Sequence, residues 1–135
     1  MTTVDAGSPF TPAPTDRTRP ELRGTFGMAA STHWLATATA QSVLERGGTA
    51  IDAAVACAFV LHVVEPHLNG PGGDLTGLVA PAGEAPVVLA GQGAAPAAAT
   101  ISHYTGLGLT EVPGAGPLAA ATPGSVVTWL TLLAE

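Results

Sequence analysis

The longest apolar run of the chain extends from Ile51 to Val64, where almost every side chain is hydrophobic. Thr49, just before the run, and Asp52, near its start, have the spacing of a capping box, in which each side chain accepts a hydrogen bond from the other residue's backbone N–H. Pro66 follows the run and stops a helix. The pattern therefore predicts a helix. Because a helix that is apolar on all sides must be buried on all sides, it also predicts protein layers on both sides of this helix.

Shorter signals predict an earlier helix and a hairpin. A helix is expected from about Trp34 to Arg46, capped by Ser31 or Thr32, because Arg46 suits the negative end of the helix dipole and Gly47 suits a left-handed stop. Two short apolar runs, residues 75–80 and 85–90, flank a turn that contains proline and glycine. Such a pair is typical of a β-hairpin.

The two ends of the chain carry different signals. Residues 1–23 are rich in Pro, Thr and Asp without any period, so we expect a disordered tail there, followed by a short extended segment over residues 25–31. Residues 91–121 are expected to be irregular. A last helix is predicted to begin near residue 122, with Thr122 as its cap and Pro123 in its first position. It runs to Glu135 without a stop signal, and a glutamate has the wrong charge for a helix C-terminus, so we expect a truncated helix and a truncated protein.

The composition excludes several classes of function. The net charge is -6 and lysine is absent, which argues against nucleic acid as a partner. Only 10% of residues are charged, against about 25% in ordinary proteins, as expected of a biased genome or of a piece whose outer faces are covered. The single cysteine, Cys57, cannot form an internal disulfide and is predicted to be a small structural hydrophobe. We see no secretory signal and no apolar stretch of membrane-spanning length, so a cytoplasmic protein without a membrane partner is expected.

The glycine-rich segment Gly70-Pro71-Gly72-Gly73 is the first candidate for chemistry. It follows a predicted helix and opens a strand, which is the reverse of a dinucleotide-binding loop, and a Walker loop would need a lysine. Its glycines are better explained by a tight turn or a close backbone approach. Because loops of this kind can line substrate pockets, Gly72, Gly73 and Asp74 are candidate pocket residues.

Metal and serine-nucleophile sites are not supported by the spacing of the relevant residues. His62 and Glu65 would share a helical face, but Pro66 ends the helix before His67, and the spacing misses the known zinc patterns. Ser102 and His103 are neighbours in sequence, where side chains seldom form a catalytic pair. No metal and no cofactor are therefore expected.

Five sequence blocks in a fixed order resemble the start of gamma-glutamyltransferases and their relatives, including the divergent branch similar to cephalosporin acylases. The blocks are GMAAS at 27–31, GGTAIDAA at 47–54, EPHLNGPGGD at 65–74, APAAAT at 95–100 and TPGSV at 122–126. The resemblance begins at Gly27 and covers about four fifths of this chain, but only the early part of the large subunit of a family member. Residues 24–135 would then be an incomplete, N-terminal segment of the family's domain.

The resemblance implies an α/β (α+β) fold, namely part of the αββα sandwich of the N-terminal-nucleophile hydrolases. Such an enzyme is made as a precursor that cuts itself into two subunits and exposes a threonine whose own amine serves as base. That threonine attacks a gamma-glutamyl or other acyl amide, such as glutathione, and water or an amino acid resolves the acyl-enzyme. No segment of this chain matches the threonine motif. We therefore expect no catalytic residue here, an inactive chain on its own, and the rest of the precursor as its partner.

One departure from the family pattern concerns the substrate. The resemblance places Gln92 where well-known members carry an arginine that grips the substrate's alpha-carboxylate. Glutamine offers a single neutral amide in place of a charged, two-pronged guanidinium. Gln92 is thus the candidate substrate-binding residue, and an altered acyl preference is expected.

Two other interpretations of the chain remain open. It could be a non-catalytic remnant of a truncated gene that associates with another chain, or a small interaction module unrelated to catalysis. A module needs a core of its own, so cooperative unfolding of the isolated chain would favour it, whereas a largely exposed apolar surface would count against it.

Overall fold

The computed structural model describes residues 22–135, so the predicted disordered tail lies almost wholly outside the described residues. The helices and strands follow one another along the chain in a mixed α and β order. They are α1 (Trp34–Glu45), α2 (Ala50–Val64), β1 (Leu75–Val79), β2 (Val87–Gly91), α3 (Ile101–Gly106), the 3-10 turn η1 (Pro117–Ala119) and α4 (Ser125–Ala134).

The start of α2 confirms the predicted capping box. The Thr49 hydroxyl accepts a hydrogen bond from the Asp52 N–H at 3.1 Å, and the Asp52 carboxylate accepts one from the Thr49 N–H at 2.8 Å. The backbone N–H of Thr49, and after it the Thr49 hydroxyl, hold the pKa of the Asp52 carboxyl below its ordinary value because both donate to the ionised form. The helix ends at Val64, two residues before Pro66.

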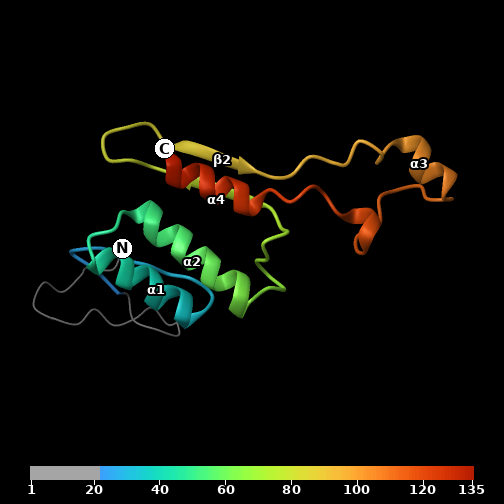
Figure 1. Ribbon diagram of the computed structural model, residues 1–135. Coiled ribbons are helices and arrows are strands. Elements are labelled where there is room, and N and C mark those ends of the chain that lie inside the picture. Colours follow the sequence, from blue (N-terminus) through green and yellow to red (C-terminus); the bar gives the residue numbers. More distant parts are fainter. Residues whose placement is uncertain (1–21) are drawn as a thin grey trace, which may run out of the picture.

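Helix α2 lies between α1 and α4, with the hairpin beyond α4 (Figure 1). The predicted layers on both sides of α2 are therefore present. The buried hydrophobic side chains between these elements are mostly small, which lets the helix backbones approach closely. They are Ala36, Ala40, Ala53, Val55, Ala58 and Leu75. The burial is nevertheless incomplete, because Val63 at the end of α2 is 78% exposed.

The hairpin is confirmed as an antiparallel pair in which Leu75 lies opposite Gly91 and Val79 lies opposite Val87. Leu75 is buried, but the side chains of Leu78 and Val88 are 66% and 70% exposed. One face of the hairpin thus stays uncovered within residues 22–135.

The predicted cap of α1 was wrong. His33 caps this helix, with its Nδ1 accepting a hydrogen bond from the Leu35 N–H at 3.2 Å. Ser31 instead donates to the His33 carbonyl at 2.8 Å, and the Thr32 hydroxyl donates to the Glu65 carboxylate beyond the end of α2. Thr32 is therefore engaged in a contact between segments far apart in sequence. Residues 25–31, expected to be extended, form no strand.

The predicted cap of α4 was also wrong. The helix begins at Ser125 with Gly124 as N-cap, so Pro123 is outside the helix, and no side chain caps it. The N–H groups of Gly124 and Ser125 donate instead to the carbonyl of Gly73, a residue of the distant loop before β1. The Thr122 hydroxyl is not needed, because a tertiary contact satisfies these donors.

The segment between β2 and α4 is more ordered than the composition suggested. It forms an arm that extends away from the other elements and carries α3 at its far end (Figure 1). Thr100 caps α3, accepting a hydrogen bond from the His103 N–H at 3.2 Å, and the Tyr104 hydroxyl donates to the Leu118 carbonyl at 2.7 Å. Within residues 22–135, no helix combines the length and the hydrophobicity needed to cross a membrane.

Candidate functional site

Three chain segments that are far apart in sequence meet at one place, which we call the glycine junction. It is made by the loop at residues 70–74 before β1, the exit of β2 at residues 91–93, and the start of α4 at residues 122–125. The Gly73 carbonyl is its centre, accepting hydrogen bonds from the Gly124 N–H at 3.2 Å and from the Ser125 N–H at 2.9 Å. The N–H of Gly73 donates to the Gly70 carbonyl at 3.0 Å, which closes the loop into a turn.

Glycine is required at the junction because backbones touch there. A Cβ at Gly93 would overlap the carbonyl of Thr122, and a Cβ at Gly124 would overlap the carbonyl of Gly91. The Thr122 N–H donates to the Ala94 carbonyl at 3.0 Å, which holds the same two segments together. Gly93 and Gly124 therefore serve close backbone approach, whereas the Gly70–Gly73 segment forms the tight turn that was one of its two expected roles.

The junction brings the sequence-predicted site residues to one edge. The Asp74 carboxylate accepts a hydrogen bond from the Gly93 N–H at 3.3 Å, and Gln92 is the residue immediately before that donor. Gln92, Asp74 and Gly72 are all exposed, and nothing lies within 4 Å of a Cβ built on Gly72. Asp74, Gln92 and Gly72 are therefore solvent-exposed residues of the two junction segments that the bond between Gly93 and Asp74 joins.

A buried polar pair lies behind this edge, and the sequence interpretation missed it. The Ser125 hydroxyl, on a side chain that is 0% exposed, lies 3.4 Å from Nε2 of His62, which is 9% exposed. The aromatic ring of Phe59 lies against His62 with ring centroids 5.3 Å apart. The two partners are 63 residues apart, so no spacing rule could have found them.

The other residues considered for chemistry have structural partners. The Ser102 hydroxyl pairs with the Thr100 hydroxyl at 3.0 Å, while the His103 ring packs edge-on against Tyr104. Glu65 accepts from Thr32. In the part of the chain that the structure describes, no group of three His, Cys, Asp or Glu side chains could hold a metal ion.

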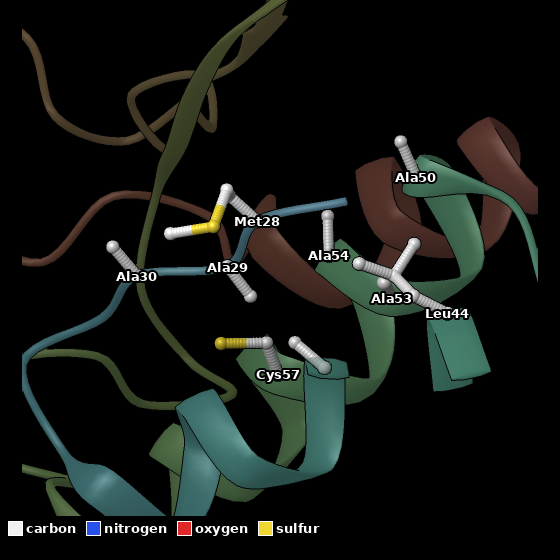
Figure 2. A pocket seen from close by; sticks show the side chains of 9 residues that line it. Met28, Ala29, Ala30, Leu44, Ala50, Ala53, Ala54 and Cys57 are labelled. Carbon is white, nitrogen blue, oxygen red and sulfur yellow. The ribbon is translucent and has the colours of Figure 1, made fainter. Parts of the chain in front are cut away.

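A separate pocket of about 220 Å³ lies between the N-terminal segment and the first two helices. Figure 2 shows the segment of Met28, Ala29 and Ala30 along one side and α2, with Ala54 and Cys57, along the other. Its lining is apolar apart from the two sulfur atoms. Apart from the Cys57 thiol, it offers no acidic, basic or charged side chain.

A sequence profile of the gamma-glutamyltranspeptidase family matches residues 36–135. The chain belongs to the gamma-glutamyltranspeptidase family. Among curated relatives, the oxamate amidohydrolase proenzyme of Klebsiella pneumoniae is 42% identical over 110 residues, which are 81% of this chain and 20% of that protein. The chain thus spans about a fifth of the length of this relative.

Two solved structures share the fold of this chain. LmbA2991HD is 66% identical with a TM-score of 0.82, over 86% of this chain and 20% of that one. The cephalosporin acylase of Bacillus halodurans is 32% identical with a TM-score of 0.74, over 91% and 24% of the two chains. The predicted family and fold class are therefore confirmed: residues 22–135 are a partial N-terminal-nucleophile hydrolase fold of mixed α and β structure.

Proposed function

We propose that this chain is the N-terminal segment of the large subunit of a self-cleaving acyl-amide hydrolase or transferase. Its partner is the rest of the same precursor, and the nucleophilic threonine lies in that remainder. The family match over residues 36–135 supports this assignment, and so does the proenzyme status of the Klebsiella relative. The isolated chain is then inactive, because no residue in it replaces the threonine.

The observation that carries the proposal is the exposed edge of the glycine junction. Asp74 and Gly72 belong to the loop before β1, Gln92 follows β2, and the hydrogen bond from the Gly93 N–H to Asp74 joins these two segments. We assign this edge to the wall of the acyl pocket. Its role is to bind and orient the acyl group while the threonine hydroxyl attacks the amide carbonyl and the threonine's own amine takes the proton.

Gln92 sets the preference of this pocket for the acyl group. A neutral amide contributes about 1 kcal/mol through a hydrogen bond, against about 1.5–3 kcal/mol for a charge-assisted bond such as arginine gives to a carboxylate. A gamma-glutamyl substrate, which carries an alpha-carboxylate, is therefore bound roughly tenfold less well or worse than with arginine. The neighbouring Asp74 carboxylate adds like-charge repulsion at the same edge.

The test is the substitution Gln92→Arg in the full-length protein. We expect kcat/KM for a gamma-glutamyl anilide to rise about tenfold, mostly through KM. Gln41→Arg is the matched control, because it adds the same charge on α1, where Gln41 contacts Glu45 away from the junction. The panel also includes oxamate and a neutral acyl amide, and the mass of the mature subunits reports self-cleavage.

Two outcomes would contradict parts of the proposal. If Gln92→Arg processes normally but gains no gamma-glutamyl hydrolysis over Gln41→Arg, Gln92 does not face the acyl group. If the full-length wild-type protein remains a single uncut chain without amidase activity, the assignment to a self-cleaving enzyme is wrong, and the non-catalytic remnant becomes the better interpretation.

A further inference from the structure

The pair formed by His62 and Ser125 joins two helices in the interior of the chain. His62 belongs to the last turn of α2 and Ser125 is the first residue of α4, and both side chains are buried. A hydrophobic pair of the same volume would fill this space without the cost of burying two polar groups. The pair therefore contributes something that packing alone does not, namely a fixed orientation.

The backbone of Ser125 passes this orientation on to the glycine junction. Its N–H donates to the Gly73 carbonyl at 2.9 Å while its hydroxyl lies 3.4 Å from His62. Ser125 is thus held from two directions, by a side chain of α2 and by the loop before β1. The peptide that follows Gly73 is that of Asp74, whose carboxylate accepts from the Gly93 N–H beside Gln92.

We propose that His62 is a positioning residue that fixes the substrate-binding edge through Ser125. The inference rests on the proposed function, since it assumes that the edge of Asp74 and Gln92 meets the acyl group. His62 itself is buried behind the junction and touches no substrate. Its hydrogen bond holds the start of α4, the start of α4 holds the Gly73 carbonyl, and the Gly73–Asp74 peptide sets the edge.

The experiment uses the full-length, self-cleaved protein with an acyl amide that the wild type hydrolyses. His62→Leu and Ser125→Ala each remove one partner, the double variant removes both, and His62→Gln restores a polar group near the position of Nε2. Thr131→Ala is the control, because it removes an exposed hydroxyl that bonds only within α4. KM, kcat, the extent of self-cleavage and the thermal midpoint are measured for each.

A positioning role predicts a specific pattern. KM rises about fivefold to tenfold in each single variant while kcat and self-cleavage stay within twofold, and His62→Gln recovers most of the loss. In the double variant the thermal midpoint returns toward wild type, because no buried polar group is left unpaired, but KM stays as high as in the single variants. The proposal would be overturned if the rise in KM and the loss of thermal stability recovered together in the double variant. Unchanged KM values in the single variants would also overturn it.

Amide hydrogen exchange separates this inference from the proposed function. If the full-length wild type hydrolyses no acyl amide, the proposed function fails, and exchange at residues 124 and 125 decides the inference alone. If His62 holds the start of α4, exchange at these two amides is faster by about fivefold or more in His62→Leu. It stays near wild type in His62→Gln and Thr131→Ala. Equal exchange in all variants would refute it, and so would His62→Gln behaving like His62→Leu. Because Ser125→Ala and His62→Gln are mild changes, they keep the test decisive if His62→Leu does not fold.

Discussion

The backbone contact at Gly93 allows the strength of the glycine junction to be calculated and tested. In Gly93→Ala, the new methyl group would overlap the Thr122 carbonyl, so the two segments must separate. Overpacking of this kind costs typically about 1–3 kcal/mol. Separation also weakens the Gly93 bond to Asp74 and the Thr122 bond to Ala94, each of which contributes about 1 kcal/mol; losing about half of each adds about 1 kcal/mol. We therefore expect the junction to lose roughly 2–4 kcal/mol.

The loss is measured by amide hydrogen exchange of the full-length protein, read out on peptides that contain residues 122–125. A loss of about 2–4 kcal/mol corresponds to exchange that is roughly 30-fold to several hundredfold faster, if these amides exchange by local opening. Gly72→Ala is the control at another glycine of the junction, because nothing lies within 4 Å of a Cβ built there and its backbone does not need a positive φ. Its exchange is expected to stay within about threefold of wild type.

The reasoning would be refuted if Gly93→Ala exchanged at residues 122–125 no faster than Gly72→Ala. The close approach of β2 and α4 would then not be a constraint on this chain, and the edge that carries Gln92 would not be fixed by it. Equal acceleration in both variants would also refute it, since the argument depends on the difference in space around the two glycines.

Two further predictions concern the start of α2. Thr49→Ala removes the acceptor for the Asp52 N–H, and we expect it to lower the free energy of unfolding by about 1 kcal/mol in urea titrations at neutral pH, whereas Thr39→Ala in mid-α1 should have a smaller effect. Because the folded-state pKa of Asp52 is lowered from 3.8, its contribution to stability is present above that value and is lost as pH falls through the lower folded pKa. Asp52→Asn should therefore reduce the fall in the free energy of unfolding at acid pH. An unchanged fall would contradict the assignment.

Local signals in the sequence were enough to predict α2 and the hairpin. The capping box at Thr49 and the stop at Pro66 act within a few residues, and so does the turn between β1 and β2. Even so, the strand ends are displaced by one or two residues, because register depends on the partner strand.

Each incorrect prediction of a helix or of its cap has a tertiary cause or concerns a very short element. The predicted cap of α4 was wrong because the Gly73 carbonyl accepts from the N–H groups of Gly124 and Ser125. Gly73 lies 51 and 52 residues before these donors in the chain. The cap of α1 was wrong because Thr32 is drawn to Glu65 and His33 takes its place. Helix α3 was missed because it has six residues in a segment rich in glycine and alanine. Its only local sign was Thr100 as a cap.

The candidate site was predictable only in part. Gly72, Gly73, Asp74 and Gln92 were singled out by a loop pattern and a family resemblance, and they lie in two segments that the bond from the Gly93 N–H to Asp74 joins. Their role in binding a substrate stays a prediction. The pair of His62 and Ser125 could not be predicted, since neither residue had a distinctive neighbourhood in sequence and their contact exists only after α2 and α4 have packed.

The distribution of hydrophobic side chains bears on the choice between a segment of a longer enzyme and an independent binding module. The buried core consists mainly of alanine, while larger side chains on α2, the hairpin and α4 lie open, among them Val63, Val88 and Val127, the last 66% exposed. A self-contained binding module would bury its large hydrophobic side chains first, since these contribute most to stability. Apolar faces on several elements at once are instead expected of a segment covered by more protein. This favours the segment of a longer enzyme over an independent module, and it agrees with one of the two explanations for the low fraction of charged residues, namely covered outer faces.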